Sequence, residues 1–359
     1  MFAPAFRNNQ FYKLTSVFSG DSKRAKSIRK SLGFKRSYDN WAQLIEDSDL
    51  DIVCIATPVY THYEIAKYAL ENNKHLILAA PFTLQVNEAL ELADLAAQKG
   101  LLGVVAHHLN FFPARKYITH LIKNGKIGVP THVHRLYRTA SKLMHKTTQS
   151  WKFNKKLGGG TLNIIGSHDI DFLLRVIGGI HKVNAFTELM YAERQNQNDE
   201  LFQCSADDAF RMNIEFHNGA KAALSASSVY PGKEANEFLF YGTEGLLTLR
   251  DDNEILFYTR EGNKERIAIP PNYQTTSLPG QKEISPFYML LESVASAIHK
   301  GTEVTPTFDE AVHVQRAIHT AHYSADTYNW IEIGSEELEN PGNASTQSSS
   351  NRQIDKIYR

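Results

Sequence analysis

The sequence has little of what marks several protein classes. It has only two cysteines in 359 residues, Cys54 and Cys204, which excludes a disulfide framework and favours a reducing compartment. Its 39 basic and 39 acidic residues cancel, so no net charge draws the chain to nucleic acid or to an anionic membrane. No apolar run approaches the ~20 residues that span a bilayer, and the first residues lack the pattern of a signal peptide. We therefore expect a soluble cytoplasmic protein with no nucleic-acid or membrane partner.

The first part of the chain alternates between short apolar strands and amphipathic helices. The pattern predicts a helix ending within residues 1–9, strands at 13–19, 50–57, 75–79 and 102–106, and helices at 22–32, 38–46, 62–71 and 83–99. Strands that are joined through helices pair in parallel, with helices on both faces of the sheet. Residues 1–127 are therefore expected to form an α/β domain of the nucleotide-binding type.

From about residue 128 the strands follow one another through tight turns. Strands are predicted at 131–138, 182–189, 209–216, 220–227, 237–242, 246–250, 255–258 and 266–269, and helices at 160–177, 286–299 and 309–328. Asn218-Gly219 between two alternating runs indicates a hairpin. Residues 128–333 are expected to form an α+β domain with one large, mainly antiparallel sheet, with the helices of 286–328 packing back near the first domain. The polar residues 334–359 predict a disordered tail.

The turn Thr57-Pro58 ends an apolar strand, at the carboxyl edge where open α/β sheets bind ligands. A dinucleotide also needs a glycine-rich turn between the first strand of such a sheet and its first helix. Neither that strand nor that turn precedes the first predicted helix here. We expect either that the natural protein begins upstream of Met1, so that this chain is truncated, or that its nucleotide site is damaged.

The turn after the strand at 13–19 bears on the choice of cofactor. An acidic residue at this place would bind the ribose hydroxyl of NAD. The strand ends instead at Ser19, and Asp21, Lys23 and Arg24 follow. A small polar residue with nearby cations suits the 2′-phosphate of NADP better. The alternative is an ordinary helix that Asp21 or Ser22 caps, with Lys23 and Arg24 in solvent.

A second constellation lies at residues 158–171, where three glycines precede a predicted helix. The glycines let the backbone pass close to another group, and His168 on the helix is a candidate acid or base. Trp151 and Lys152 precede the glycines and are candidates to line the same loop. The alternative is that His168 is a structural histidine. We find no spacing typical of metal ligands, because the adjacent His107 and His108 would face opposite ways on a strand.

Five segments follow one another in the order and at the spacing of a known family. They are Thr57-Pro58 and its preceding strand with His62, residues 74–81 with Pro81, residues 122–128, residues 151–171, and residues 240–245. On these segments the chain resembles the Gfo/Idh/MocA family, the glucose–fructose oxidoreductase and inositol dehydrogenase group. Residues 205–210 and 229–232 are more similar to the glucose–fructose oxidoreductase domain-containing branch.

The resemblance implies a Rossmann-type domain, a C-terminal sheet domain and hydride transfer between NAD(P) and a sugar, polyol or related small molecule. It places Thr57, Pro58, His62 and Pro81 near the cofactor, whose ribose end would lie near Ser19, Lys23 and Arg24. His168 becomes the proton-transfer residue of a substrate pocket. The other residues expected at this pocket are Trp151, Lys152, Asn163 and Ile164. The family also implies a dimer or tetramer formed through the C-terminal sheet.

The chain departs from the family pattern at positions that carry chemistry. The family has a lysine where this chain has Ala80, a glutamate at Ala79, and often a carboxylate at Ile164. Alanine can neither donate a proton nor stabilise an alkoxide. Two alternatives to the enzyme therefore stay open: a non-catalytic ligand-binding or regulatory member of the family, and a truncated fragment that binds no cofactor.

Overall fold

The computed structural model describes residues 2–143, 147–274 and 285–335 of the 359-residue chain. Contacts divide the chain into two compact units. Unit 1 contains the described parts of residues 1–111 and 275–312, and unit 2 contains those of residues 112–274 and 313–359. Residues 112–127, which the sequence analysis placed in the first domain, thus pack in unit 2. The end of the predicted tail, residues 336–359, lies outside the described residues.

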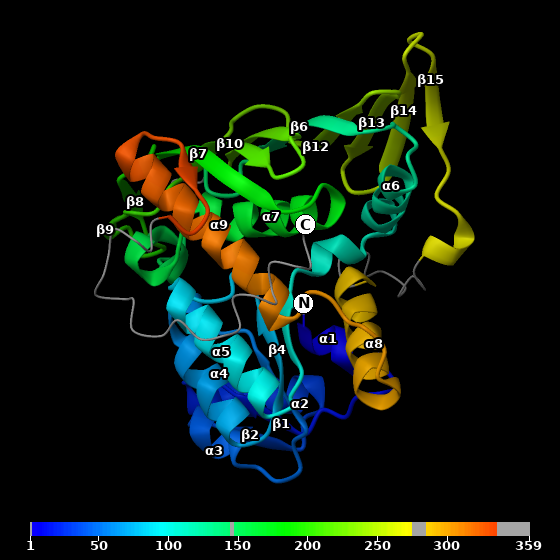
Figure 1. The fold of residues 1–359 in the computed structure, drawn as a ribbon. Helices are drawn as coiled ribbons and strands as arrows, with labels where there is room; N and C mark the ends of the chain where they lie inside the picture. Colours follow the sequence, from blue (N-terminus) through cyan, green and yellow to red (C-terminus); the bar gives the residue numbers. More distant parts are fainter. Residues whose placement is uncertain (1, 144–146, 275–284, 336–359) are drawn as a thin grey trace. The chain divides into compact units, whose positions relative to one another are not determined.

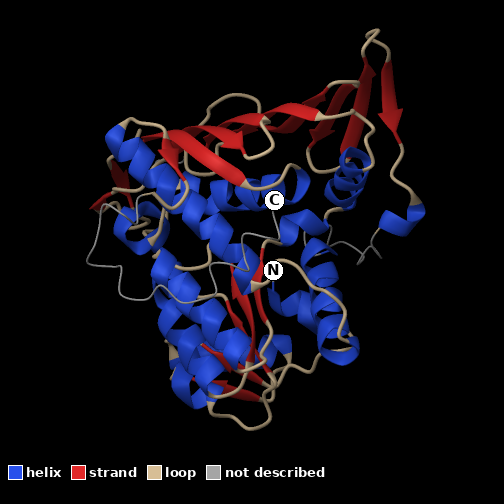
Figure 2. Cartoon of the chain, in the orientation of Figure 1, coloured by secondary structure: helices blue, strands red, loops and turns tan. Residues whose placement is uncertain are grey.

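Unit 1 is built on short parallel strands (Figures 1 and 2). Its described residues form a two-stranded sheet, β1 (Ser16–Phe18) and β2 (Arg36–Tyr38), and a three-stranded sheet in the order β3 (Ile52–Ile55), β4 (His75–Ala79) and β5 (Gly103–Ala106). Each strand is joined to the next through a helix, as parallel pairing requires. The expectation of an α/β domain with a parallel sheet is confirmed.

Helices of unit 1 pack against both faces of the strands β3 to β5. They are α1 (Phe2–Arg7), α3 (Trp41–Ile45), α4 (His62–Glu71), α5 (Val86–Gln98) and α8 (Ser285–Lys300). The helix α2 (Ser22–Leu32) packs against β1 and β2, and unit 1 also has the 3-10 turns η1 (Val59–Thr61) and η2 (His108–Phe111). Leu76 and Leu78 of β4 pack with α3, α4 and α5, whereas Ile77 points to the other face, where α1 and α8 lie. This alternation explains why β4 is apolar at every buried position.

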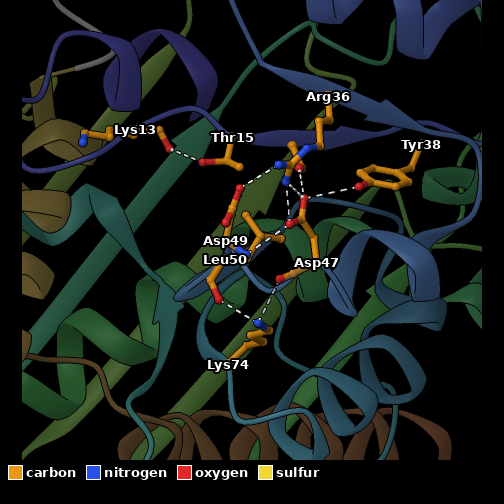
Figure 3. A network of polar contacts seen from close by, with 9 residues as sticks. Lys13, Thr15, Arg36, Tyr38, Asp47, Asp49, Leu50 and Lys74 are labelled. Atoms are coloured by element: carbon orange, nitrogen blue, oxygen red, sulfur yellow. Dashed lines mark hydrogen bonds and ion pairs between the residues drawn. The ribbon is translucent and has the colours of Figure 1, made fainter.

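A polar network holds the amino ends of the strands in unit 1 (Figure 3). Asp47 Oδ2 accepts hydrogen bonds from Ser16 at 2.8 Å and Tyr38 at 3.2 Å, and Arg36 pairs with the same carboxylate at 2.6 Å. The Lys74 ammonium donates to the Asp47 carbonyl at 3.1 Å. Burial alone would raise the pKa of Asp47, but the hydrogen bonds from Arg36 and Ser16 lower it to about 2. This network lies at the strand end opposite to the expected ligand edge, so we assign it a structural role.

Unit 2 contains a large mixed sheet. Nine strands of its described residues pair in the order β15 (Lys264–Ile267), β14 (Glu254–Thr259), β13 (Gly245–Arg250), β12 (Ala235–Gly242), β6 (Pro130–Arg138), β11 (Lys221–Ser227), β10 (Ala209–Phe216), β7 (Ile180–Glu188) and β16 (Ile331–Glu332). The pairs are antiparallel except for β6 with β11. The predicted hairpin at Asn218-Gly219 joins β10 to β11. The large, mainly antiparallel sheet is therefore confirmed.

Helices cover one face of this sheet, and no described element covers the other (Figure 2). They are α6 (Pro113–Lys123), α7 (Ser167–Val176) and the part of α9 (Phe308–Thr327) that belongs to unit 2, with the π-helical segment η5 (Leu162–Gly166) leading into α7 and the 3-10 turns η3 (Trp151–Phe153), η4 (Lys155–Leu157) and η6 (Pro271–Tyr273). A small antiparallel pair, β8 (Glu193–Gln195) and β9 (Leu201–Gln203), stands apart from the large sheet.

Candidate functional site

The turn after β3 is held by its own hydroxyl groups. The Thr61 hydroxyl lies 2.7 Å from the Thr57 hydroxyl and 2.8 Å from the Pro58 carbonyl. Thr57 and Pro58 are half-buried and Ala56 is exposed, so the turn presents part of its backbone to solvent. Because this turn ends a parallel strand, it lies at the ligand edge of the sheet.

His62 connects this turn to the loop after β4. Its side chain is buried, with Nε2 2.9 Å from the Thr57 carbonyl and Nδ1 3.0 Å from the Phe82 carbonyl. Burial lowers the pKa of His62, against the opposing effect of the two carbonyls. A neutral imidazole donates through one nitrogen only, so one of the two contacts lacks a proton. His62 therefore positions the turn with its ring, which has no open edge for a ligand.

The end of β4 carries no ionisable side chain. Ala79 is the last residue of the strand, and both it and Ala80 are half-buried before the buried Pro81. Neither alanine side chain has a group that can move a proton.

The helix after β1 is capped by its own acidic residue. The Asp21 carboxylate accepts from the backbone of Lys23 at 2.8 Å and of Arg24 at 3.1 Å, and so it caps α2. The side chains of Lys23 and Arg24 are exposed, and Ser19 is half-buried. Gly20 is the one glycine in a strand-to-helix turn of the described part of unit 1, and it has open space around its Cα. The described turns of unit 1 thus provide no glycine-rich cradle for the pyrophosphate of a dinucleotide.

In unit 2 the glycine segment passes close to groups of the protein itself. Gly158 has φ 79° and caps η4. A Cβ on Gly159 would collide with the Lys152 carbonyl, and one on Gly160, where φ is 115°, would collide with the Asp207 carboxylate. The close approach predicted for these glycines is therefore an approach to η3 and to Asp207.

The residues after the glycines form a π-helical turn and then α7. His168 is half-buried and is the second residue of α7. Asn163 is half-buried too; its amide donates to the Gly159 carbonyl at 3.2 Å, and its oxygen lies 2.8 Å from Nε2 of His322 on α9. Since an amide oxygen only accepts, His322 carries its proton on Nε2. π-helical turns occur frequently at functional sites.

The other predicted pocket residues lie along the same segment. Trp151 is half-buried and Lys152 is exposed, both on η3, and the Lys152 carbonyl accepts from Gly160 N at 3.1 Å. Ile164 is half-buried in η5. The structure thus gathers Trp151, Lys152, Asn163 and Ile164 around the glycine segment that precedes His168.

Three polar residues that contact this segment were not predicted from the sequence. Asp207 and Lys142 lie beside Thr161, at the start of the π-helical turn, and His322 binds Asn163. Burial lowers the pKa of His322 to about 4, so its ring is neutral at neutral pH. Asp207 lies within residues 205–210, which carried part of the resemblance, but no local pattern gave it a role.

No group of three His, Cys, Asp or Glu side chains in the described residues is arranged to hold a metal ion. No helix in the same residues is both long and apolar enough to cross a membrane.

Two family models match the chain. Residues 1–107 match the oxidoreductase family with an NAD-binding Rossmann fold, and residues 116–248 match the GFO/IDH/MocA C-terminal domain. The first match lies in unit 1 and the second lies in unit 2.

Relatives match over most of their length. An uncharacterized oxidoreductase of Synechocystis is 24% identical over 340 residues, which are 92% of this chain and 92% of that protein. Levoglucosan dehydrogenase of Pseudarthrobacter phenanthrenivorans is 26% identical over 86% of each chain. The solved structure of a levoglucosan dehydrogenase in complex with NADH and L-sorbose shares the fold, with a TM-score of 0.85 and 23% identity over 92% of this chain and 93% of that one. This chain therefore belongs to the Gfo/Idh/MocA family of oxidoreductases.

Proposed function

We propose that this protein is an NAD(P)-dependent oxidoreductase that acts on the alcohol or carbonyl group of a sugar, a polyol or a related small molecule. The observation that carries the proposal is His168, half-buried on the first turn of α7 behind the glycine segment. Of the two histidines expected at the site, His62 contacts a backbone carbonyl through each ring nitrogen, so His168 is the better candidate for acid–base chemistry. The family and its dehydrogenase relatives support hydride transfer.

The proposed residues have separate roles in this reaction. When bound, the nicotinamide supplies or accepts the hydride. The turn that contains Thr57 and Pro58, fixed by His62 and followed along the edge by Pro81, would hold the nicotinamide side. His168 takes the hydroxyl proton during oxidation and returns it during reduction. The substrate would be oriented by four neighbours of His168 in the chain, Trp151, Lys152, Asn163 and Ile164.

A second candidate function rests on the end of β4. With alanine at positions 79 and 80, the groups that polarise the substrate in the family are missing. A family member that binds a small ligand or a nucleotide without turning it over would have the same fold and the same glycine segment. Binding and turnover therefore have to be measured separately.

Adding NADH or NADPH to the purified protein is expected to change the nicotinamide fluorescence. We propose tighter binding of NADPH, because Lys23 and Arg24 lie exposed beside Ser19, where a 2′-phosphate would lie. Replacing both cations with alanine is then expected to weaken NADPH binding by about two- to thirtyfold, as for two exposed ion pairs of ~0.2–1 kcal/mol each. NADH binding should not change.

The matched control is Lys26→Ala, which removes an exposed cation from the same helix. Equal binding of NADH and NADPH by the unaltered protein would contradict the preference for NADP. No fluorescence response to either nucleotide would contradict the enzyme proposal itself.

We also propose that two copies pair through the uncovered face of the large sheet, as a dimer or within a tetramer. Ala223 is exposed near the centre of this face, on β11, between Asn213 and His134 on the adjacent strands. An arginine at 223 is expected to break this pairing, so that light scattering finds monomers in place of a dimer, or dimers in place of a tetramer. The control is Ala192→Arg, which adds the same side chain at an exposed position before β8. An unchanged mass for Ala223→Arg would contradict this interface.

A further inference from the structure

The π-helical segment η5 begins at a single acidic residue. The backbone N–H of Thr161 donates to the Asp207 carbonyl at 3.1 Å, and the N–H of Leu162 donates to the Asp207 carboxylate at 2.9 Å. The first N–H groups of a helix have no partner within the helix. Asp207 therefore supplies acceptors to two of them.

The surroundings leave Asp207 little freedom. Its side chain is buried, and it fills the space where Gly160 lacks a Cβ. The hydroxyl of the fully buried Thr161 lies 3.3 Å from the Asp207 carbonyl and 3.0 Å from both the Asp208 carbonyl and the Ser228 hydroxyl. The start of η5 is thus fixed from several sides, with Asp207 as the common partner.

The register of η5 determines where α7 presents its side chains. A π-helical turn contains one residue more than the corresponding α-helical turn. If the segment returned to α-helical register, the side chains that follow would rotate by about 100° around the axis. His168 follows η5 after one residue, so its direction depends on how η5 is held.

We propose that Asp207 is a positioning residue for His168: by anchoring the first turn of η5, it sets the direction in which α7 presents the histidine. This inference rests on the proposed function, in which His168 moves the proton.

Several charged groups surround this carboxylate. Lys142 Nζ lies 3.4 Å from both the Asp207 carbonyl and the Thr161 hydroxyl, and Arg194 pairs with Asp208 at 2.8 Å. Burial raises the pKa of Asp207 to about 6, while Leu162 N–H and Lys142 oppose the rise. Burial lowers the pKa of Lys142, against the effect of Asp207 and Asp208.

The test compares Asp207→Ala with Asp207→Asn in the full chain. The ring signals of His168 are followed by NMR on protein with labelled histidines and are assigned from their absence in His168→Gln. Alanine removes the anchor and is expected to shift these signals and to lower kcat by about 10²-fold, as misplacement of a reacting group does, with little change in KM. Asparagine keeps an acceptor for Leu162 N–H. It is expected to return the His168 signals to their natural positions and kcat to within about threefold of the natural value.

The matched control is Asp208→Asn, because Asp208 pairs with Arg194 and accepts from the backbone of Met190 and Tyr191. It is expected to lower stability without moving the His168 signals. The inference is overturned if the signals stay in place in Asp207→Ala, or if Asp208→Asn moves them as far. If the His168 signals move in Asp207→Ala but the natural protein turns over no substrate, the positioning role stands and the proposed function is refuted.

The pH dependence of the free energy of unfolding reports separately on the protonation of Asp207. A carboxyl whose pKa is higher in the folded state than in the unfolded state favours folding below the unfolded pKa, and this contribution is lost as the pH rises through the folded value. Asp207→Asn should therefore gain stability relative to the natural protein between about pH 4 and pH 6. A stability difference that is constant with pH would show that Asp207 does not titrate in this range.

Discussion

Replacing His168 with alanine is expected to lower turnover by about 10²–10⁴-fold, the usual contribution of a general acid or base. With alanine at positions 79 and 80, no other described residue of the family's proton-transferring set remains to take over this role. Nucleotide binding should stay within about twofold, because the residues proposed to hold the cofactor lie in unit 1. The measurement is a pair of assays on the same protein, nicotinamide fluorescence for binding and nicotinamide absorbance for turnover.

The control for this variant is His120→Ala. His120 is an exposed histidine on α6, also in unit 2, and its loss should change neither assay. Turnover that is equal in His168→Ala and in the natural protein would remove His168 from the mechanism. Loss of nucleotide binding together with turnover would indicate instead that the substitution disrupts the fold.

Replacing Arg135 with methionine is expected to lower the free energy of unfolding by about 3–5 kcal/mol, as breaking a buried ion pair does. The Arg135 side chain is 2% exposed; it donates to Asp169 at 3.0 Å and to Asn236 at 2.7 Å, and it lies over the ring of Phe238. Methionine fills apolar space but leaves the carboxylate of Asp169 buried without its ion-pair partner. Urea unfolding, with hydrogen exchange to localise the effect to unit 2, measures the loss.

The sign of the pH effect follows from Asp169. Burial raises its pKa, and the Arg135 charge opposes this rise. Without Arg135 the folded-state pKa rises further, so the protonated carboxyl favours the folded variant in acid and this contribution is lost as the pH rises. The loss caused by Arg135→Met should therefore be smaller at about pH 5 than at about pH 8.

Two further variants separate the ion pair from general effects. Arg260→Met removes an exposed arginine that pairs with Glu244, also in unit 2, and it should cost at most about 1 kcal/mol. Adding Asp169→Leu to Arg135→Met should recover part of the loss, because the unpaired charge is gone. Equal losses from Arg135→Met and Arg260→Met would contradict the structural role of the buried pair.

Most of the fold could be predicted because its long elements carry strong periodicity. The strand β10 and the helix α4 have the predicted bounds, and the hairpin at Asn218-Gly219 follows from its turn residues. The missed elements have weaker signals. Strands of two or three residues, such as β2, β8, β9 and β16, are too short to show alternation, and α6 buries a charged residue, Arg115, on its apolar face.

The candidate site could be predicted only where its residues are close in the sequence. His168 and Asn163 follow the glycines within one segment, so the motif contains them. Asp207 lies 45 positions after Leu162, and His322 lies 159 positions after Asn163. Only the packing of β10 and α9 against the π-helical turn brings these residues together, and the sequence carries no local trace of it.

The central claim is that this protein transfers hydride and that His168 moves the accompanying proton. The most direct test is incubation with NADH or NADPH that carries deuterium at the transferring carbon, together with a panel of keto-sugars and oxidised polyols, followed by mass spectrometry of the products. The account predicts a reduced product with one deuterium from the natural protein. The His168→Ala variant should form at least about 10²-fold less of this labelled product. Bound nucleotide with no labelled product from any substrate would contradict it and would favour the binding protein instead.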